Sequence, residues 1–284
     1  MGKELSCRAE AAAEYDRACF HVSAHFLPFL LRAARLAPGQ RVLDVATGTG
    51  IAAEAALGIV GPAGSVLATD ISSEMVAKAR ERLDQSPNAA VAMEDGQALT
   101  LADESFDAVL SSLGLMFFPD PARALAEFHR VLRPGGRAAV SVLTTPERSY
   151  NGRINVIVAR YMPNLAQATA RTFALGDAGR LRLLFHEAGF LDIETGTEKH
   201  TFVLPSFDTY YGHLNAAAVQ PVRRWFRCPK RFATPCGKRC GRRSVMTAGR
   251  YRSTWRSGSS AAGGSRHLGT GRTRQRAQAG DFDH

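Results

Sequence analysis

Short apolar runs of strand length alternate with amphipathic segments over the first 145 residues. The runs that we interpret as strands are 41–46, 65–70, 88–95, the first half of 106–118, and 137–144. The segments with helical spacing are 51–57, 72–85 and 120–136, the second of them opened by a capping serine, Ser72. This alternation predicts a parallel sheet with helices on both faces, the α/β doubly wound class.

Helical spacing also precedes this region. Residues 10–36 are rich in Ala, Leu, Phe and Arg and predict one or two helices, with a break near Pro28. We expect residues 1–37 to form an N-terminal helical cap and residues 38–145 to form the core that binds a ligand.

The regular alternation loosens after Thr145. Residues 146–176 predict cap helices, 177–190 a helix, and 191–205 two strands joined around Gly196. A helix followed by two strands, after five parallel strands, predicts a mostly parallel seven-stranded sheet with an antiparallel C-terminal hairpin. We therefore assign 146–222 to the same domain.

The formal net charge of +10 is concentrated at one end. Residues 223–284 hold 16 Lys or Arg and two Asp, no Glu, and three aliphatic or Met residues. Such a segment cannot build a core and predicts a disordered basic tail. Its Arg-rich composition fits either a gene read in a shifted frame, which we favour, or an arm that contacts nucleic acid nonspecifically.

The cysteines indicate a reducing compartment. Five Cys in a long chain argue against a disulfide framework, and we expect a cytoplasmic protein. Cys228, Cys236 and Cys240 lack the paired spacing of a zinc site, so no metal is expected. No run of about 18 apolar residues predicts a membrane span.

The stretch "RVLDVATGTGIAAEAA" (41–56) reads as strand, glycine turn and helix. Gly48 and Gly50 let the backbone approach a ligand closely, and the helix that follows offers N–H groups to an anion. The pattern also fits a dinucleotide site, because Asp70 lies where a ribose-binding acid is expected. An NAD(P)-dependent oxidoreductase is therefore one candidate.

Asp44, on the strand itself, favours another ligand. A carboxylate beside the turn would repel a pyrophosphate but attract an ammonium group. S-adenosylmethionine carries an ammonium group, a carboxylate for the helix N-terminus, and a ribose for Asp70.

With these residues the sequence resembles the class I S-adenosylmethionine-dependent methyltransferases, of Rossmann-like fold. The segments that carry the resemblance are "VLDVATGTG", "VLATDIS", "MEDGQAL" and "SFDAVLSSLGLMFFPDPARALAEFHRVLRPGGR". The nearest branch is the type 11 group, which includes the ubiquinone/menaquinone-biosynthesis methyltransferases. The resemblance covers residues 38–145 well, and 146–210 only in architecture.

The resemblance implies a role for each matching residue. Thr47, Gly48 and Gly50 would line the methionine portion, with Asp44 near its ammonium group. Asp70 would accept from the ribose hydroxyls, and Ile71 and Met75 would pack on the adenine. The remaining expected contacts are Asp95 with the adenine amino group, Gly96 beside it, Ser111 at the methionine end, and Tyr15 closing over the cofactor.

Each residue also has a structural interpretation. Asp44 could hold the turn, Asp70 could cap the next helix, and Asp95 could stabilise its own loop. Met75 and Tyr15 could be packing residues, and Ser112 could take the place of its neighbour Ser111.

The expected reaction is in-line methyl transfer to a small molecule, an EC 2.1.1 activity. A general base is needed only if the acceptor loses a proton, and His200 and His213 are weak candidates. An RNA methyltransferase or nucleic-acid binder that uses the basic tail is the alternative.

Overall fold

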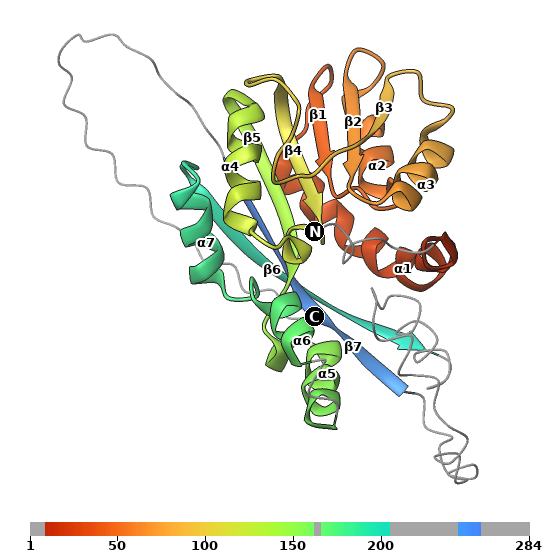
Figure 1. Cartoon of the computed structure of the whole chain (residues 1–284), viewed down its shortest axis with the longest axis vertical. Helices are drawn as coiled ribbons and strands as arrows, with labels where there is room; N and C mark the ends of the chain where they lie inside the picture. The colour runs from red at the N-terminus through yellow and green to blue at the C-terminus, as the bar shows by residue number, and fades with distance from the viewer. Residues whose placement is uncertain (1–8, 162–165, 205–243, 257–284) are drawn as a thin grey trace, which may run out of the picture.

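The computed structural model describes residues 9–161, 166–204 and 244–256. Its strands form one sheet in the order β3-β2-β1-β4-β5-β7-β6 (Figure 1). The strand bounds are β1 Arg41–Val45, β2 Ser65–Asp70, β3 Ala89–Met93, β4 Phe106–Ser112, β5 Leu132–Leu143, β6 Ile193–Leu204 and β7 Ser244–Arg256. The first five are parallel, and β7 runs antiparallel to both of its neighbours.

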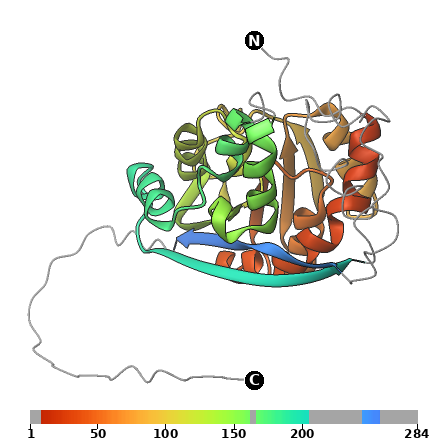
Figure 2. The ribbon, with the colours of Figure 1, turned by 90° about the horizontal axis from the view of Figure 1, so that it is seen from below.

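Helices cover both faces of this sheet (Figure 2). The helices α1, α2 and α3 contact one another on one face, and α4 and α7 pack together on the other. Their bounds are α1 Ala9–Ala34, α2 Ile51–Val60, α3 Ser73–Leu83, α4 Pro121–Val131 and α7 Ala178–Glu187. The remaining elements are η1 Leu115–Phe117, η2 Pro146–Arg148, α5 Tyr150–Tyr161 and α6 Ala166–Phe173.

One hydrophobic core lies on each face of the sheet, because successive side chains along a strand point to opposite faces. Ala138, Val140 and Val142 of β5 pack toward α4 and α7, whereas Ala139 packs toward α1 and α2. Because side chains alternate between the faces of a strand, both cores need apolar residues at consecutive positions. This explains why the predicted strands are continuous apolar runs.

The prediction of a Rossmann-like α/β fold with five parallel strands is confirmed. The prediction of two strands joined around Gly196 is wrong, because Ile193–Leu204 forms the single strand β6. Glycine at this position does not interrupt the pairing, and Gly196 lies opposite Ser253 of β7.

The partner of β6 comes from the basic tail. The prediction that this tail lacks regular structure is wrong for Ser244–Arg256, which forms β7 between β5 and β6. Backbone hydrogen bonds hold a strand in a sheet whatever its charge, and the Val, Thr, Tyr and Trp of this segment favour extended chain.

The N-terminal helix does not break where expected. Pro28 lies inside α1, which continues to Ala34. Proline removes one intrahelical hydrogen bond, and the packing of Phe26, Leu27 and Leu30 in the core favours the continuous helix despite that loss. In the part of the chain that the structure describes, no helix is long and apolar enough to cross a membrane.

Candidate functional site

The sheet order reverses between β1 and β4, where ligands bind in open α/β sheets. The residue after each strand is left-handed, with φ of 56° at Ala46, and 55° at Leu113. Such backbone is costly for residues with a Cβ and gathers at functional sites. The N–H of Leu113 donates to the carbonyl oxygen of Ser141 at 3.0 Å, which fixes this turn on β5.

The glycine turn after β1 is held by its neighbours. Gly48 and Gly50 have φ of 59° and 89°, and Gly50 is the N-cap of α2. The N–H of Thr47 donates to the carbonyl of Thr69 on β2 at 2.9 Å. The Nε of Arg82 donates to the carbonyl of Thr49 at 2.7 Å. The turn is therefore anchored to β2 and α3 before any ligand arrives.

Asp44 lies beneath this turn and is completely buried. The hydroxyl of Thr47 donates to its Oδ2 at 2.5 Å, but Oδ1 has no hydrogen-bond partner among the described residues. Burial raises the pKa of Asp44 to about 7, and the nearby charge of Asp70 adds to the rise, whereas the Thr47 bond and the nearby backbone N–H of Ala53 oppose it. A buried acceptor without a donor is costly and suits a cationic ligand.

Asp70 ends β2, beside the same turn. Its Oδ2 accepts from the N–H of Gly48 and its Oδ1 from the N–H of Ser72, both at 2.9 Å. Burial raises the pKa of Asp70, and these backbone bonds lower it. Ser72 is the N-cap of α3, so the interpretation of Asp70 as that cap is wrong. Each carboxylate oxygen keeps a second acceptor position.

Ser111, near the end of β4, is also completely buried, and its Oγ has no partner among the described residues. A Cβ added to Gly114 would come within 2.7 Å of this oxygen and of the Cβ of Ala46. The hydroxyl of Ser111 therefore lies where the turns after β1 and β4 meet.

Asp95 follows β3 and has a structural use within its own loop. Its Oδ1 accepts from the backbone N–H of Gln97 at 2.9 Å and from the Gln97 side chain at 3.2 Å. A Cβ on Gly96 would lie 2.7 Å from Cγ1 of Val45 and 2.6 Å from the Phe118 ring. This loop thus closes against the end of β1.

The two apolar candidates differ in exposure. Ile71 is 45% exposed directly after Asp70, whereas Met75 is 8% exposed and its N–H donates to the Ser72 hydroxyl. Ile71 is therefore accessible to a ligand, whereas Met75 is buried.

His200, a candidate base, lies on β6 and stacks on His25 of α1 with ring centroids 3.7 Å apart. Phe202 packs against both rings. The structure thus joins His200 to an aromatic cluster rather than to the turns after β1, β2 and β4. His213 lies outside the described residues, and of Tyr15 only its place in α1 is described.

Several residues of this site could not be identified from the sequence patterns described above. Thr69 accepts from the N–H of Thr47, and Arg82 reaches the turn from α3, 33 positions away. Left-handed Ala46 and Leu113 are equally invisible, because neither is a residue type that favours that conformation. Gly114, which lies close to Ala46 and Ser111, could have been recognised from the sequence, since glycine often marks such close contacts.

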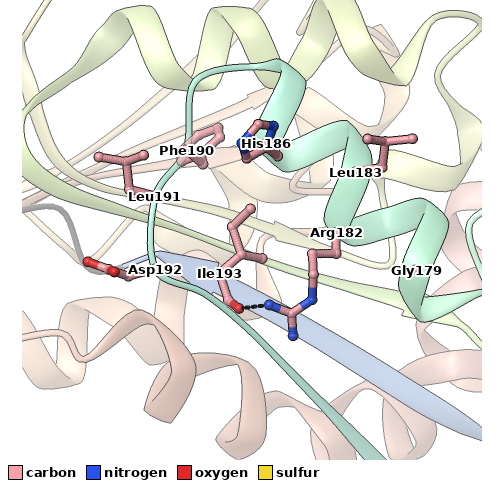
Figure 3. A pocket seen from close by; sticks show the side chains of 8 residues that line it. All are labelled: Gly179, Arg182, Leu183, His186, Phe190, Leu191, Asp192 and Ile193. Atoms are coloured by element: carbon pink, nitrogen blue, oxygen red, sulfur yellow. Dashed lines mark hydrogen bonds between the residues drawn. The ribbon is translucent and has the colours of Figure 1, made fainter.

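A pocket lies elsewhere, between α7 and the start of β6. Figure 3 shows Leu183 and His186 on α7, with Leu191 and Ile193 on the segment opposite. Arg182 donates a hydrogen bond to the carbonyl of Ile193 across its floor. No group of three or more potential metal ligands occurs here or in any other described region.

Comparison with known proteins identifies a protein family whose model matches part of this chain. Residues 43–140, about a third of the chain, match the model of the methyltransferase domain family. The matched segment contains the turns after β1, β2 and β4.

Two curated relatives are each 34% identical over 157 residues, or 55% of this chain. One is an uncharacterized protein of Mycobacterium tuberculosis, and the other is the ubiquinone/menaquinone biosynthesis C-methyltransferase of Cupriavidus pinatubonensis. The chain covers 56% of the first and 63% of the second, which is less than two thirds of either relative.

A similar solved structure is phosphoethanolamine N-methyltransferase 2 of Haemonchus contortus in complex with S-adenosyl-L-methionine. It is 16% identical with a TM-score of 0.56, over 88% of this chain and 57% of that one. Likeness at this identity concerns the fold.

Proposed function

Because the chain contains a class I S-adenosylmethionine-dependent methyltransferase domain, we propose that it transfers a methyl group to a small-molecule acceptor. S-adenosylmethionine is the cofactor of this domain. The observation that carries the proposal is the buried Asp44 carboxyl at the glycine turn, whose Oδ1 lacks a hydrogen-bond donor among the described residues.

The chain's polar groups suit the parts of this cofactor. Asp44 would attract the ammonium group, and Thr47, Gly48 and Gly50 would line the methionine portion. The Oγ of Ser111 would hydrogen-bond at the same end, because it is buried and has no partner among the described residues. This would relieve the desolvation penalty of two buried polar groups.

The remaining contacts involve the nucleoside. Asp70 would accept from the ribose hydroxyls with the acceptor positions that its backbone bonds leave free. Ile71 would cover one adenine face, with Met75 beneath it. Asp95 and Gly96 would meet the adenine edge, using the Asp95 oxygen that does not bond Gln97.

The same acids argue against a dinucleotide. Asp44 and Asp70 interact electrostatically, and a pyrophosphate at Gly48 would add negative charge to this buried pair. An NAD(P)-dependent oxidoreductase is therefore the weaker candidate.

The methyl group on a sulfonium is already activated for attack by a nucleophile, so the protein's main tasks are alignment and exclusion of water. The rigid turns after β1 and β4 would hold the methionine end in one orientation. The attacking acceptor atom would form a bond to the methyl carbon as the carbon–sulfur bond breaks. Any proton on that atom would leave to solvent or to a base on the acceptor side.

An apolar small molecule is the acceptor class that the surroundings favour. Leu115 and Met116 are buried after β4, and Phe117 is 45% exposed beside them. We place the reaction in the cytoplasm. The proposed acceptor is not a nucleic acid, and any contact of the tail with nucleic acid would be nonspecific.

We propose that the basic tail is the product of a shifted reading frame. The native frame would then supply the antiparallel C-terminal strand of a seven-stranded sheet at the position that Ser244–Arg256 occupies as β7. Translation of the coding DNA in the other frames tests it. A methyltransferase-like continuation after about residue 220 is expected, and its absence in both frames would refute the shift.

A thermal-unfolding titration tests the proposed function. S-adenosylhomocysteine at one hundred times its Kd should raise the free energy of unfolding by about 2.7 kcal/mol, while NADH has no effect. Stabilisation by NADH alone would identify a dinucleotide site instead.

A further inference from the structure

The helix α5 presents an apolar face to solvent. Val156, Ile157 and Tyr161 are 39%, 52% and 83% exposed. Arg153 and Arg160 are exposed as well. These five residues occupy positions i, i+3, i+4, i+7 and i+8, so they lie on one side of the helix. We call this set the α5 face.

Another side of α5 packs against the protein. A Cβ added to Gly152 would lie 2.5 Å from the Cα of Pro146, so helix and η2 are in close contact there. Ile154, Asn155 and Ala159 are partly buried. Val156, Ile157 and Tyr161 are thus more exposed than Ile154 and Ala159, whereas the apolar side of an ordinary surface helix faces the core.

The position of α5 leaves this face accessible. In Figure 1 the helix lies with α6 at the lower end of the molecule, away from α2 and α3. It contacts η2, α6 and β7. It follows β5 and η2 at the carboxyl end of the parallel strands, the end that carries the glycine turn.

The charge in the sequence around the face is mostly positive. Residues 146–173 contain four arginines, Arg148, Arg153, Arg160 and Arg171, and a single acid, Glu147. Arginine beside exposed aliphatic side chains and a tyrosine is the composition of helices that lie in a membrane interface, where arginine reaches phosphates.

We propose that the α5 face docks on the surface of an anionic lipid bilayer. Its apolar side chains would insert at the headgroup boundary, and its arginines would pair with lipid phosphates. A second copy of the chain fits less well, because a twofold contact between two α5 faces would bring arginines of one copy near arginines of the other. The bilayer would then lie at the end of the sheet where the proposed methyl transfer occurs.

Vesicle co-sedimentation of the full chain tests the proposal. We expect binding to vesicles of phosphatidylcholine and phosphatidylglycerol, and much weaker binding to phosphatidylcholine alone. Arg153→Gln should lower the partition coefficient about fivefold, the share of one arginine at an anionic surface. Ile157→Ser should lower it about tenfold through the loss of buried apolar surface.

Matched controls separate this face from other charges, including the basic tail. Arg180→Gln and Leu191→Ser alter an exposed arginine and a 57% exposed leucine outside α5. These variants should bind like the unchanged chain. Equal binding by all four variants would assign vesicle binding to the tail and overturn the proposal. Lack of binding to the anionic vesicles would also overturn it and leave an acidic protein as the partner.

Discussion

The hydroxyl of Thr47 donates a 2.5 Å hydrogen bond to Oδ2 of Asp44, three residues earlier in the chain. The second oxygen of this completely buried carboxyl has no hydrogen-bond partner among the described residues, although the backbone N–H of Ala53 is near enough to lower the pKa of Asp44. The arrangement is costly for the ligand-free protein and becomes favourable when a cationic group reaches the free oxygen. It therefore links stability, pH and cofactor affinity at one residue.

Cofactor affinity should depend on pH around neutrality. Burial raises the pKa of Asp44 to about 7, so below that pH the ligand-free carboxyl carries a proton. An ammonium group favours the carboxylate, and binding must then release this proton. The Kd of S-adenosylhomocysteine should rise up to about tenfold for each pH unit below 7, and change little above it.

Calorimetric titration at pH 6 and pH 8 in buffers of different ionisation enthalpy measures this linkage. We expect proton release at pH 6 that disappears in Asp44→Asn. Tight binding without proton release at either pH would separate Asp44 from the ammonium group and leave the cofactor assignment intact.

Asp44→Asn should make the ligand-free protein more stable while weakening cofactor binding. A carboxyl whose pKa is raised on folding stabilises the fold below its unfolded pKa of 3.8, and this contribution is lost as pH rises to about 7. Above pH 7 the neutral amide should gain on the order of 4 kcal/mol in unfolding free energy. Chemical denaturation at pH 5 and pH 8 measures the gain, which should be larger at pH 8.

Asp107→Asn is the contrasting control. Asp107 accepts from the N–H of Arg41 at 2.7 Å and pairs with Arg133 at 2.9 Å. Its loss should lower stability and leave Kd unchanged. A stability loss in Asp44→Asn as well would mean that this carboxyl is satisfied within the fold.

Asp70→Ala should weaken S-adenosylhomocysteine binding by about tenfold or more, because hydrogen bonds to charged groups contribute about 1.5–3 kcal/mol. The variant also frees the N–H groups of Gly48 and Ser72, so the turn loses one of its ties to β2, and the bond between Thr47 and Thr69 remains. Asp84→Ala, an exposed acid at the end of α3, is the matched control. Unchanged affinity in Asp70→Ala would remove the assigned ribose contact.

Ser111→Ala distinguishes a binding residue from a packing residue. Its hydroxyl is buried without a partner among the described residues, so its removal should raise the unfolding free energy by about 1 kcal/mol. If the hydroxyl meets the cofactor, the same change should raise Kd several-fold. Ser112→Ala, the half-buried neighbour, should change neither quantity. If the Kd of S-adenosylhomocysteine rises in Ser112→Ala and not in Ser111→Ala, Ser112 is the residue that binds the cofactor and Ser111 is a packing residue.

The five parallel strands and their order along the chain could be predicted from the sequence. The apolar runs gave β1 and β2 almost to the residue and placed β4 within 106–118, because strands buried on both faces admit few polar residues. The capping role of Ser72 was predicted correctly as well. The helix through Pro28 was not, because long-range packing outweighed a local signal.

The rest could not be predicted because it depends on contacts between distant residues. The residues around His25 and His200 in the sequence do not indicate that the two rings stack. The strand β7 belongs to a segment whose charge predicted disorder. At the site, residue types indicated Asp44 and Asp70. Their hydrogen bonds, and the oxygen that remains free on Asp44, became visible only with the fold.

Calorimetric titration of the full chain with S-adenosylhomocysteine and with NADH tests the central claim most directly. Our account predicts saturable one-to-one binding of S-adenosylhomocysteine at pH 8, weakened in Asp70→Ala, and no heat of binding with NADH. Binding of NADH without binding of S-adenosylhomocysteine would contradict it.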